Sequence, residues 1–343
     1  AAVALLSFLL WLVPSGFILG VVLVRIFIGF GSFLLFPRKN DYKSERIDAF
    51  LAFLQKHEDQ LDVICVQECY ETLFLSGGYR KRLIEGAKRL GFLHAACPPA
   101  IARFPGTLSI NSGLVILSRF KIVRWKDLCF GPSVESFNVN RGALHAELEN
   151  GIHVVTAHVA PDASANGPYS SLTSWPIRFA RRSQADELVR FIGRQVPSSS
   201  PLILAADLNL NIRFSSFHSQ PILSSAARYL LSRLHERCDL VEVNASLRSE
   251  KRAKASAEPV VDHMRPTFGY TGEDGSPAER WITTYGGGML RSVCDDAILC
   301  RGMKPQQVKE LCLVIPEGQR PIPEVTHITD HWALTCQLEL IVS

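Results

Sequence analysis

Short apolar runs, separated by turn residues and amphipathic stretches, recur along most of the chain after residue 44. Most of these runs are about four to eight residues long, which is typical of buried strands. The predicted strands cover residues 62–68, 111–118, 143–149, 152–158, 201–206, 293–300 and 332–341. Asn150 and Gly151 stand between two of them, and this dipeptide predicts a hairpin turn.

Helical spacing of apolar residues marks the segments between the strands. Ile47, Phe50, Leu51 and Leu54 fall on one face of a helix that we expect Ser44 to cap. Further helices are predicted over residues 79–91, 178–192 and 223–235. Strands interleaved with helices in this way predict a layered α/β sandwich without an internal repeat.

The first 36 residues differ from the rest because Arg25 is their only charged residue. This stretch is long enough to cross ~30 Å of hydrocarbon. We predict that residues 1–29 form a hydrophobic membrane segment, which is a span or, because of the Pro14-Ser15-Gly16 break, a hairpin. Positive residues follow it at Arg38, Lys39 and Lys43, so we expect a membrane-associated protein whose remaining domain faces the cytosol.

The remaining domain, residues 30–343, has the composition of a globular protein. Overall, 47% of the residues are hydrophobic and 20% are charged, which excludes disordered, collagen-like and multi-span membrane classes. The net charge of +4 gives no argument for a nucleic acid, so we do not expect one as a partner. Nine cysteines, an odd number, favour buried free thiols. We interpret the polar, glycine-rich residues 244–292 as a surface insertion.

Acids, amides and imidazoles gather at or just past the ends of the predicted strands. They are Glu68, His158, Asp207, Asn209, Asp296, Asp330 and His331. Each alone could be a turn former or a satisfied core residue. Because α/β sheets usually place their sites at strand ends, the coincidence of all of them predicts one shared site.

The chemistry of this set narrows the reaction class. Carboxylate oxygens suit Mg²⁺, or Mn²⁺ in its place, and two histidines could serve as general base and general acid. The sequence has no cysteine phosphatase loop, no Gly-rich Lys-Ser/Thr nucleotide loop and no Gly-x-Ser-x-Gly elbow. Metal-assisted hydrolysis of a phosphoester is the chemistry that remains.

In order and context, four short motifs resemble the endonuclease/exonuclease/phosphatase superfamily, the magnesium-dependent DNase I-like proteins. The motifs are VICVQE ending at Glu68, AADLNL around Asp207, DAIL from Asp296 and Thr329-Asp330-His331. The match covers roughly residues 30–341. It implies a four-layer α/β/β/α sandwich of the DNase I-like type.

The resemblance also implies a metal ligand and a base. Glu68 would bind the metal ion, and Asp330 would support the metal or the histidine beside it. His331 would be the general base that activates water, and Asp296 would orient its ring. The first strand of the family ends near an asparagine that helps to hold the metal, and the corresponding position here is Ser32.

The residues that would face the phosphate follow from the same resemblance. Asp207 and Asn209 would position the nucleophile and the phosphate. His158 would stabilise the pentacovalent phosphate or protonate the leaving group. Asn111 and Arg141 would contact the phosphate.

Within the superfamily, three stretches are most similar to neutral sphingomyelinases, which also carry hydrophobic membrane segments. They are NSGLVILSRFKI at 111–122, Arg141-Gly142-Ala143-Leu144 and TDHWALTCQLEL at 329–340. The similarity implies a membrane-associated phosphodiesterase that converts a sphingomyelin-type phospholipid to ceramide and phosphocholine. Its partners would be that lipid and an anionic membrane surface, and we expect a monomer.

Other functions remain open. A phosphoinositide or inositol polyphosphate phosphatase is suggested by Pro266-Thr267-Phe268. A nuclease would use basic and aromatic residues such as Trp175, Arg178 and Arg181, which we instead expect to form a solvated face or to contact lipid headgroups. A membrane-bound pseudoenzyme is suggested by Ser32 and by Ala206, which replaces a glycine of the family pattern and could crowd the phosphate.

Overall fold

The computed structural model of the chain describes most of the domain that follows the predicted membrane segment. It covers residues 42–70, 78–99, 111–131, 140–160, 174–210, 225–243, 296–311, 313, 315–321, 328, 329, 331 and 333–341. The predicted membrane segment at 1–29 and the predicted insertion at 244–292 lie outside these residues. None of the described helices has both the length and the apolar run that a membrane crossing requires.

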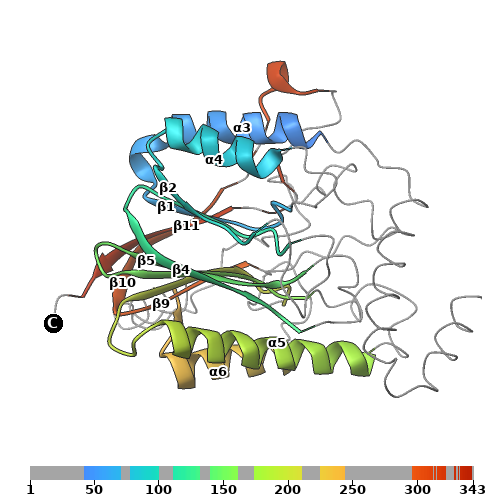
Figure 1. The fold of residues 1–343 in the computed structure, drawn as a ribbon, viewed down its shortest axis with the longest axis vertical. Helices are drawn as coiled ribbons and strands as arrows, with labels where there is room; N and C mark the ends of the chain where they lie inside the picture. The colour runs from blue at the N-terminus through green and yellow to red at the C-terminus, as the bar shows by residue number, and fades with distance from the viewer. Residues whose placement is uncertain are drawn as a thin grey trace, which may run out of the picture.

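Two β-sheets lie face to face between two pairs of helices, which gives four layers (Figure 1). Successive side chains of a strand point to opposite faces, so apolar residues on both faces call for packing on both sides. Leu144 and Val154 are buried between the sheets, whereas Val155 and Leu204 belong to the core under the helices. The predicted α/β sandwich is confirmed.

The smaller sheet is antiparallel and has the order β1-β3-β2. Its strands are β1 (Val63–Val66), β2 (His94–Ala96) and β3 (Val115–Ser118). Helices α3 (Lys43–Lys56) and α4 (Tyr79–Arg89) cover its outer face, where Leu83, Phe92 and Leu117 are buried together. Each such side chain stabilises the fold by about 1.5–3 kcal/mol on burial.

The larger sheet is mixed and has the order β4-β5-β6-β7-β9-β8. Its strands are β4 (Ile122–Cys129), β5 (Gly142–Leu148), β6 (His153–His158), β7 (Leu202–Asp207), β8 (Val241–Glu242) and β9 (Asp296–Arg301). Only β6 and β7 are parallel, and the other neighbours are antiparallel. Helices α5 (Ser174–Gln195) and α6 (Ser225–Cys238) cover the outer face of this sheet.

A two-stranded antiparallel ribbon and two short 3-10 helices complete the described part. The ribbon consists of β10 (Met303–Leu311) and β11 (Ala333–Leu340), and the 3-10 helices are η2 (Glu58–Gln60) and η6 (Glu317–Gln319). The ribbon packs on the larger sheet through Met303, Cys336 and Leu338, which contact Ile298 and Cys300 of β9 in one apolar cluster. No disulfide joins any two of the seven cysteines that the structure describes.

Each predicted strand and helix in the described residues is present, but four strands were not predicted. They are β2, β4, β8 and β10. Strand β4 carries exposed charged residues at the sheet edge, and β10 contains Pro305 next to a register shift. The expected cap at Ser44 is wrong, because α3 begins after Tyr42, whose φ is 56°, and Ser44 lies inside the helix, where Arg82 bonds its hydroxyl.

Candidate active site

The polar residues of β6, β7 and β9 meet in one row because of strand register. His158 is paired with Asp207 in the parallel ladder, and Asp207 is paired with Asp296 in the antiparallel ladder. Residues paired in this way have Cβ atoms about 4.5–5.5 Å apart. Two acids and an imidazole therefore lie together at one end of these central strands, where β6 and β7 end and β9 begins.

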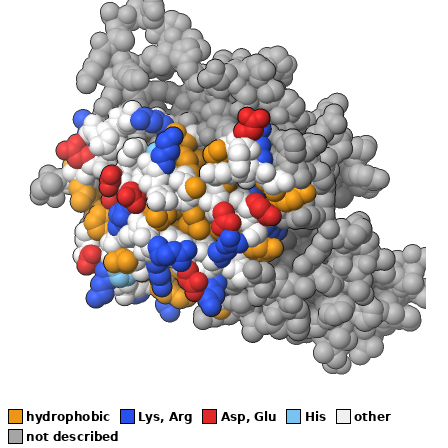
Figure 2. Space-filling model, turned by 90° about the horizontal axis from the view of Figure 1, so that it is seen from above, with side chains coloured by type: hydrophobic (Ala, Val, Ile, Leu, Met, Phe, Trp, Pro, Cys, Tyr) orange, Lys and Arg blue, Asp and Glu red, His pale blue; other side chains and the backbone are white. Residues whose placement is uncertain are grey.

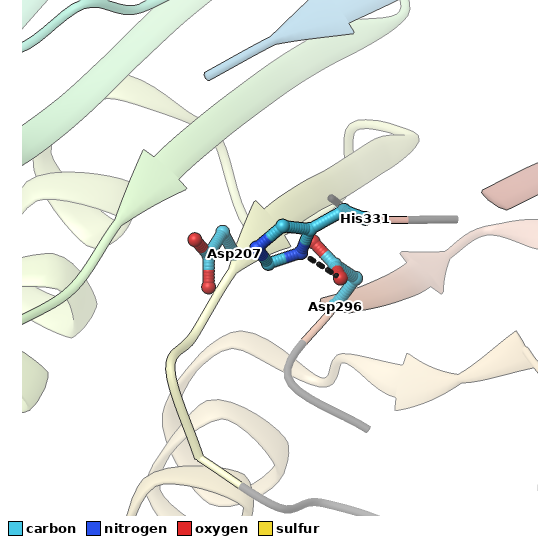
Figure 3. A group of neighbouring side chains, drawn as sticks. All are labelled: Asp207, Asp296 and His331. Atoms are coloured by element: carbon cyan, nitrogen blue, oxygen red, sulfur yellow. Dashed lines mark hydrogen bonds and ion pairs between the residues drawn. The ribbon is translucent and has the colours of Figure 1, made fainter. Parts of the chain in front are cut away.

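His331 lies beside this row and completes a group with Asp207 and Asp296 (Figure 3). One ligand atom from each residue lies within 4.8 Å of the other two. The Nδ1 of His331 is 2.8 Å from Oδ2 of Asp296. Because a carboxylate can only accept, Nδ1 carries the hydrogen, so in the neutral ring the lone pair is on Nε2. Nε2 points toward Asp207 in Figure 3.

His158 and Asp207 form a buried pair next to that group. Nε2 of His158 is 3.1 Å from Oδ2 of Asp207, and their side chains are 1% and 6% exposed. Burial raises the pKa of the Asp207 carboxyl. The charge and hydrogen bond of His158, the charge of His331 and the backbone N–H of Asn209 outweigh it and lower that pKa to about 2. Asp207 is therefore an anion at neutral pH.

Glu68 reaches the same imidazole from the opposite sheet. It follows β1 in the left-handed region, with a φ of 60°. Its Oε1 lies 3.7 Å from Nε2 of His158 and 3.7 Å from Nη1 of Arg141, and its side chain is 59% exposed. The preceding residue Gln67 donates to Oγ1 of Thr156 on β6 at 2.8 Å. This bond joins the two sheets next to Glu68.

The two asparagines predicted to face the phosphate make internal hydrogen bonds in this structure. Asn209 donates from Nδ2 to the carbonyl of Val159 at 2.9 Å, and its backbone N–H donates to Oδ1 of Asp207 at 2.9 Å. Asn111 is buried, and its Oδ1 accepts from the N–H of Gly113 at 3.0 Å. Both side chains hold loops at the site edge, and their roles toward a phosphate stay predictions.

Arg141 lies against both ring nitrogens of His158, with Nη1 2.6 Å from Nδ1. Its Nε is buried and has no hydrogen-bond partner among the described residues. The arginine precedes Gly142, where a Cβ atom would lie 2.1 Å from the carbonyl oxygen of Leu128. Only glycine lets β4 and β5 approach this closely, and this approach fixes where Arg141 enters the site.

Two of the predicted metal ligands, Ser32 and Asp330, lie outside the described residues. Ala206, the departure from the family glycine, has its methyl group in the core shared with α5 and α6. Neighbouring residues of a strand point to opposite faces, so this methyl group does not face the same side as Asp207. The expected crowding of a phosphate by Ala206 is therefore wrong for this arrangement.

The donor set fits a divalent cation. Glu68, Asp207 and Asp296 supply carboxylate oxygens around the two imidazoles, and hard oxygen ligands of this kind suit Mg²⁺. The group of three that lies within 4.8 Å contains Asp207, Asp296 and His331. It does not include Glu68, whose carboxylate lies 3.7 Å from Arg141 and from His158.

Two residues of the site were not identified from the sequence. Tyr70 contacts Glu68, Arg141 and His158 through its hydroxyl. Arg181, expected on a solvated face, is instead 4% exposed and donates to the carbonyls of Ala160 and Asn209. These two hydrogen bonds hold the loops that follow β6 and β7. A tyrosine after a strand and an arginine on a helix give no periodic signal.

Comparison with known proteins identifies the class. The endonuclease/exonuclease/phosphatase family matches residues 28–302, which is most of the chain. The chain therefore belongs to this family, as its motifs predicted. The name of the family includes both nucleases and phosphatases, so membership alone does not select a substrate.

Individual proteins that are similar in sequence or fold include sphingomyelinases. A sphingomyelinase of Dictyostelium discoideum is 29% identical over 180 residues, which are 46% of this chain and 38% of that protein. Sphingomyelinase C from Streptomyces griseocarneus has the same fold, with a TM-score of 0.54 and 17% identity, over 85% of this chain and 90% of that one. So does a beta toxin variant from Staphylococcus aureus with bound magnesium ions, with a TM-score of 0.54 and 15% identity, over 88% and 94% of the two chains.

Proposed function

We propose that this protein is a metal-dependent phosphodiesterase that hydrolyses a sphingomyelin-type phospholipid to ceramide and phosphocholine. The observation that carries the reaction type is the meeting of Glu68, Asp207, Asp296, His158 and His331 at the strand ends. The substrate class is supported by the similarity to the Dictyostelium discoideum sphingomyelinase.

The site geometry is suited to proton transfer from water. Nε2 of His331 would accept a proton from a water molecule whose oxygen attacks the phosphorus atom. The hydrogen bond of 2.8 Å from Nδ1 to Asp296 would hold the ring and stabilise the imidazolium that forms. The bond between phosphorus and the ceramide oxygen then breaks, and that oxygen takes up a proton.

Arg141 and His158 are placed to meet the charge of the phosphate. The guanidinium of Arg141 carries a positive charge beside His158, and its side chain is 13% exposed, so it would attract a phosphate oxygen. Glu68, Asp207 and Asp296 would hold Mg²⁺, or Mn²⁺, and this cation would neutralise charge on the phosphate.

We also propose that residues 1–29 hold the domain at a membrane, with the site on the cytosolic side and an anionic lipid surface beside it. A lipid substrate lies in the bilayer, so attachment would raise its effective concentration at the site. Flotation of the full chain with phosphatidylserine vesicles, compared with a chain that lacks residues 1–29, tests this proposal. Equal flotation of both would contradict it. Sedimentation of the shortened chain tests the expected monomer.

Phosphocholine release from sphingomyelin vesicles, with and without Mg²⁺, tests the activity. We expect release that needs Mg²⁺ and that falls by roughly 10²- to 10⁴-fold in His331→Ala. Equal release by both proteins would refute the assignment of the site. Parallel assays with a lysophospholipid, a phosphoinositide and abasic DNA separate the sphingomyelinase from a phosphoinositide phosphatase and a nuclease. A folded protein that is inactive on all of them would be a pseudoenzyme.

A further inference from the structure

The hydroxyl of Tyr70 lies at the centre of the polar groups that surround Glu68. It is 3.3 Å from Oε1 of Glu68, 3.1 Å from Nη1 of Arg141 and 3.3 Å from Nδ1 of His158. The rings of Tyr70 and His158 also face each other, with centroids 6.5 Å apart and an interplanar angle of 29°. The hydroxyl of Tyr229, by comparison, bonds Asp186 between α5 and α6.

The donor and acceptor roles of Tyr70 follow from its charged neighbours. Ionised Asp207 accepts from Nε2 of His158 at 3.1 Å. Arg141 can only donate, and its Nη1 lies against the ring nitrogens of His158 and 3.1 Å from the oxygen of Tyr70. The one hydrogen of the phenol is then left to bond Oε1 of Glu68. Tyr70 thereby connects the exposed carboxylate of Glu68 to the buried Asp207–His158–Arg141 cluster.

The backbone around Tyr70 is shaped to hold the phenol in this place. Glu68 has a φ of 60°, and the N–H of Tyr70 donates to its carbonyl at 2.8 Å. The N–H of Cys69 donates to the carbonyl of Gly113 at 2.8 Å, which ties this turn to the loop before β3. A Cβ at Gly113 would lie 2.6 Å from Cδ1 of Tyr70, so glycine at this position makes room for the ring.

We propose that Tyr70 is a positioning residue, which holds the carboxylate of Glu68 in the orientation that binds the divalent cation. The expected effect of Tyr70 on turnover rests on the proposed function, whereas its expected effect on cation binding does not. Glu68 is 59% exposed and has no other hydrogen-bond donor among the described contacts except the more distant Arg141 and His158, both at 3.7 Å. Without the phenol oxygen, its carboxylate would sample other rotamers.

The expected effect is on affinity for the cation. Partners that orient a metal ligand typically change metal affinity by 10- to 100-fold when they are removed. For Tyr70→Phe we expect roughly 10-fold weaker Mg²⁺ binding, because one bond of several around Glu68 is lost. Turnover at limiting Mg²⁺ should fall in parallel. Excess Mg²⁺ should restore it to about the wild-type value, while KM for the lipid changes little.

Isothermal titration calorimetry with Mg²⁺ alone measures the affinity of the purified full chain, and circular dichroism verifies the fold. Tyr229→Phe is the matched control, because its hydroxyl also bonds a carboxylate, Asp186, at 2.9 Å, but between α5 and α6. We expect wild-type affinity for this control. Unchanged Mg²⁺ affinity in folded Tyr70→Phe would overturn the proposal, and so would a loss of turnover that excess Mg²⁺ does not restore.

A second measurement avoids any loss of stability in Tyr70→Phe. In protein labelled with 3-fluorotyrosine, Glu68→Gln should shift one ¹⁹F resonance, because the acceptor of the Tyr70 hydroxyl changes from a carboxylate to an amide. An unchanged spectrum would overturn the proposed bond. Wild-type protein that binds Mg²⁺ but hydrolyses no lipid would refute the proposed function alone, since the effect of Tyr70 on binding could still be measured.

Discussion

His158 and Asp207 are direct partners in the parallel ladder of β6 and β7, and their side chains meet at 3.1 Å between Nε2 and Oδ2. Both are almost fully buried, so their mutual interaction is weakly screened by solvent. Since Glu68 contacts the same Nε2 from the other sheet, this pair lies where the two sheets share one polar site.

Asp207→Asn is expected to remove activity while it keeps the local turn. The amide oxygen of asparagine can still accept from the backbone N–H of Asn209, which bonds Oδ1 at 2.9 Å in the wild type. The negative charge between His158 and His331 is lost, and we expect phosphocholine release to fall by roughly 10²-fold or more. Asp186→Asn, in the bond to Tyr229 between α5 and α6, is the control and should keep wild-type turnover.

The same substitution should affect stability in a defined pH range. The pKa of Asp207 is lowered to about 2 in the fold, so its charge stabilises the protein above the ordinary carboxyl pKa near 4. That stabilisation, about 2 kcal/mol, is lost as the pH falls toward 2. Urea unfolding should show a gap between wild type and Asp207→Asn at pH 7 that narrows below pH 4. A constant gap would contradict it.

The pair of Asp296 and His331 predicts non-additive losses. If Asp296 acts by orienting the ring through the 2.8 Å bond to Nδ1, its removal matters only while the imidazole is present. Asp296→Asn should lower kcat by roughly 10- to 100-fold, and His331→Ala by roughly 10²- to 10⁴-fold. The double variant should match His331→Ala. Multiplication of the two losses would mean that Asp296 acts independently of the ring.

The sequence predicted this row of residues because their strands are apolar on both faces and end in polar residues. Strands β6 and β7 are therefore clear apolar runs in the sequence. In the fold, the strand register places His158, Asp207 and Asp296 side by side. Tyr70 was not predicted, because its role depends on contacts with Arg141 and His158, which come from the other sheet. No local pattern encodes such a contact.

Charged residues at a sheet edge and in the core account for two of the differences from the prediction. Arg124 and Lys126 interrupt the apolar pattern of β4, so no strand was predicted there, although a strand at the edge of a sheet can expose one row of charged side chains. Arg181 read as part of a solvated helix face, yet two backbone carbonyls satisfy its guanidinium in the interior. In both cases the partners are distant in sequence, so hydrophobic periodicity does not detect them.

Gly142 is predicted to be essential for the junction between the edge strand and the site. Gly142→Ala would place a Cβ 2.1 Å from the carbonyl oxygen of Leu128, and β4 or β5 would have to move. We expect a loss of roughly 2 kcal/mol in the free energy of unfolding, and lower turnover because Arg141 moves with the strand.

Gly193→Ala in α5 is the control, since no atom lies within 4 Å of its added Cβ. It should stabilise the helix by about 0.5–1 kcal/mol. Equal effects of the two substitutions in urea unfolding would contradict this account.

A second buried imidazole pair, His145 and His153, predicts a loss of stability in mild acid. Nε2 of His145 is 2.9 Å from Nδ1 of His153, and Nδ1 of His145 is buried with no partner among the described residues. Burial, the neighbouring His153 and Arg124 lower the pKa of His145 to about 4, and burial also lowers the pKa of His153. The unfolded chain thus binds more protons than the fold between pH 4 and about 6.5, so stability is full above that range and falls as the pH decreases through it. His145 alone accounts for about 3 kcal/mol of this loss.

Chemical unfolding of His145→Gln at pH 7.5 and pH 5 should show a clearly smaller drop in the free energy of unfolding than the wild type shows. A drop of the same size in both proteins would mean that this pair does not control acid stability.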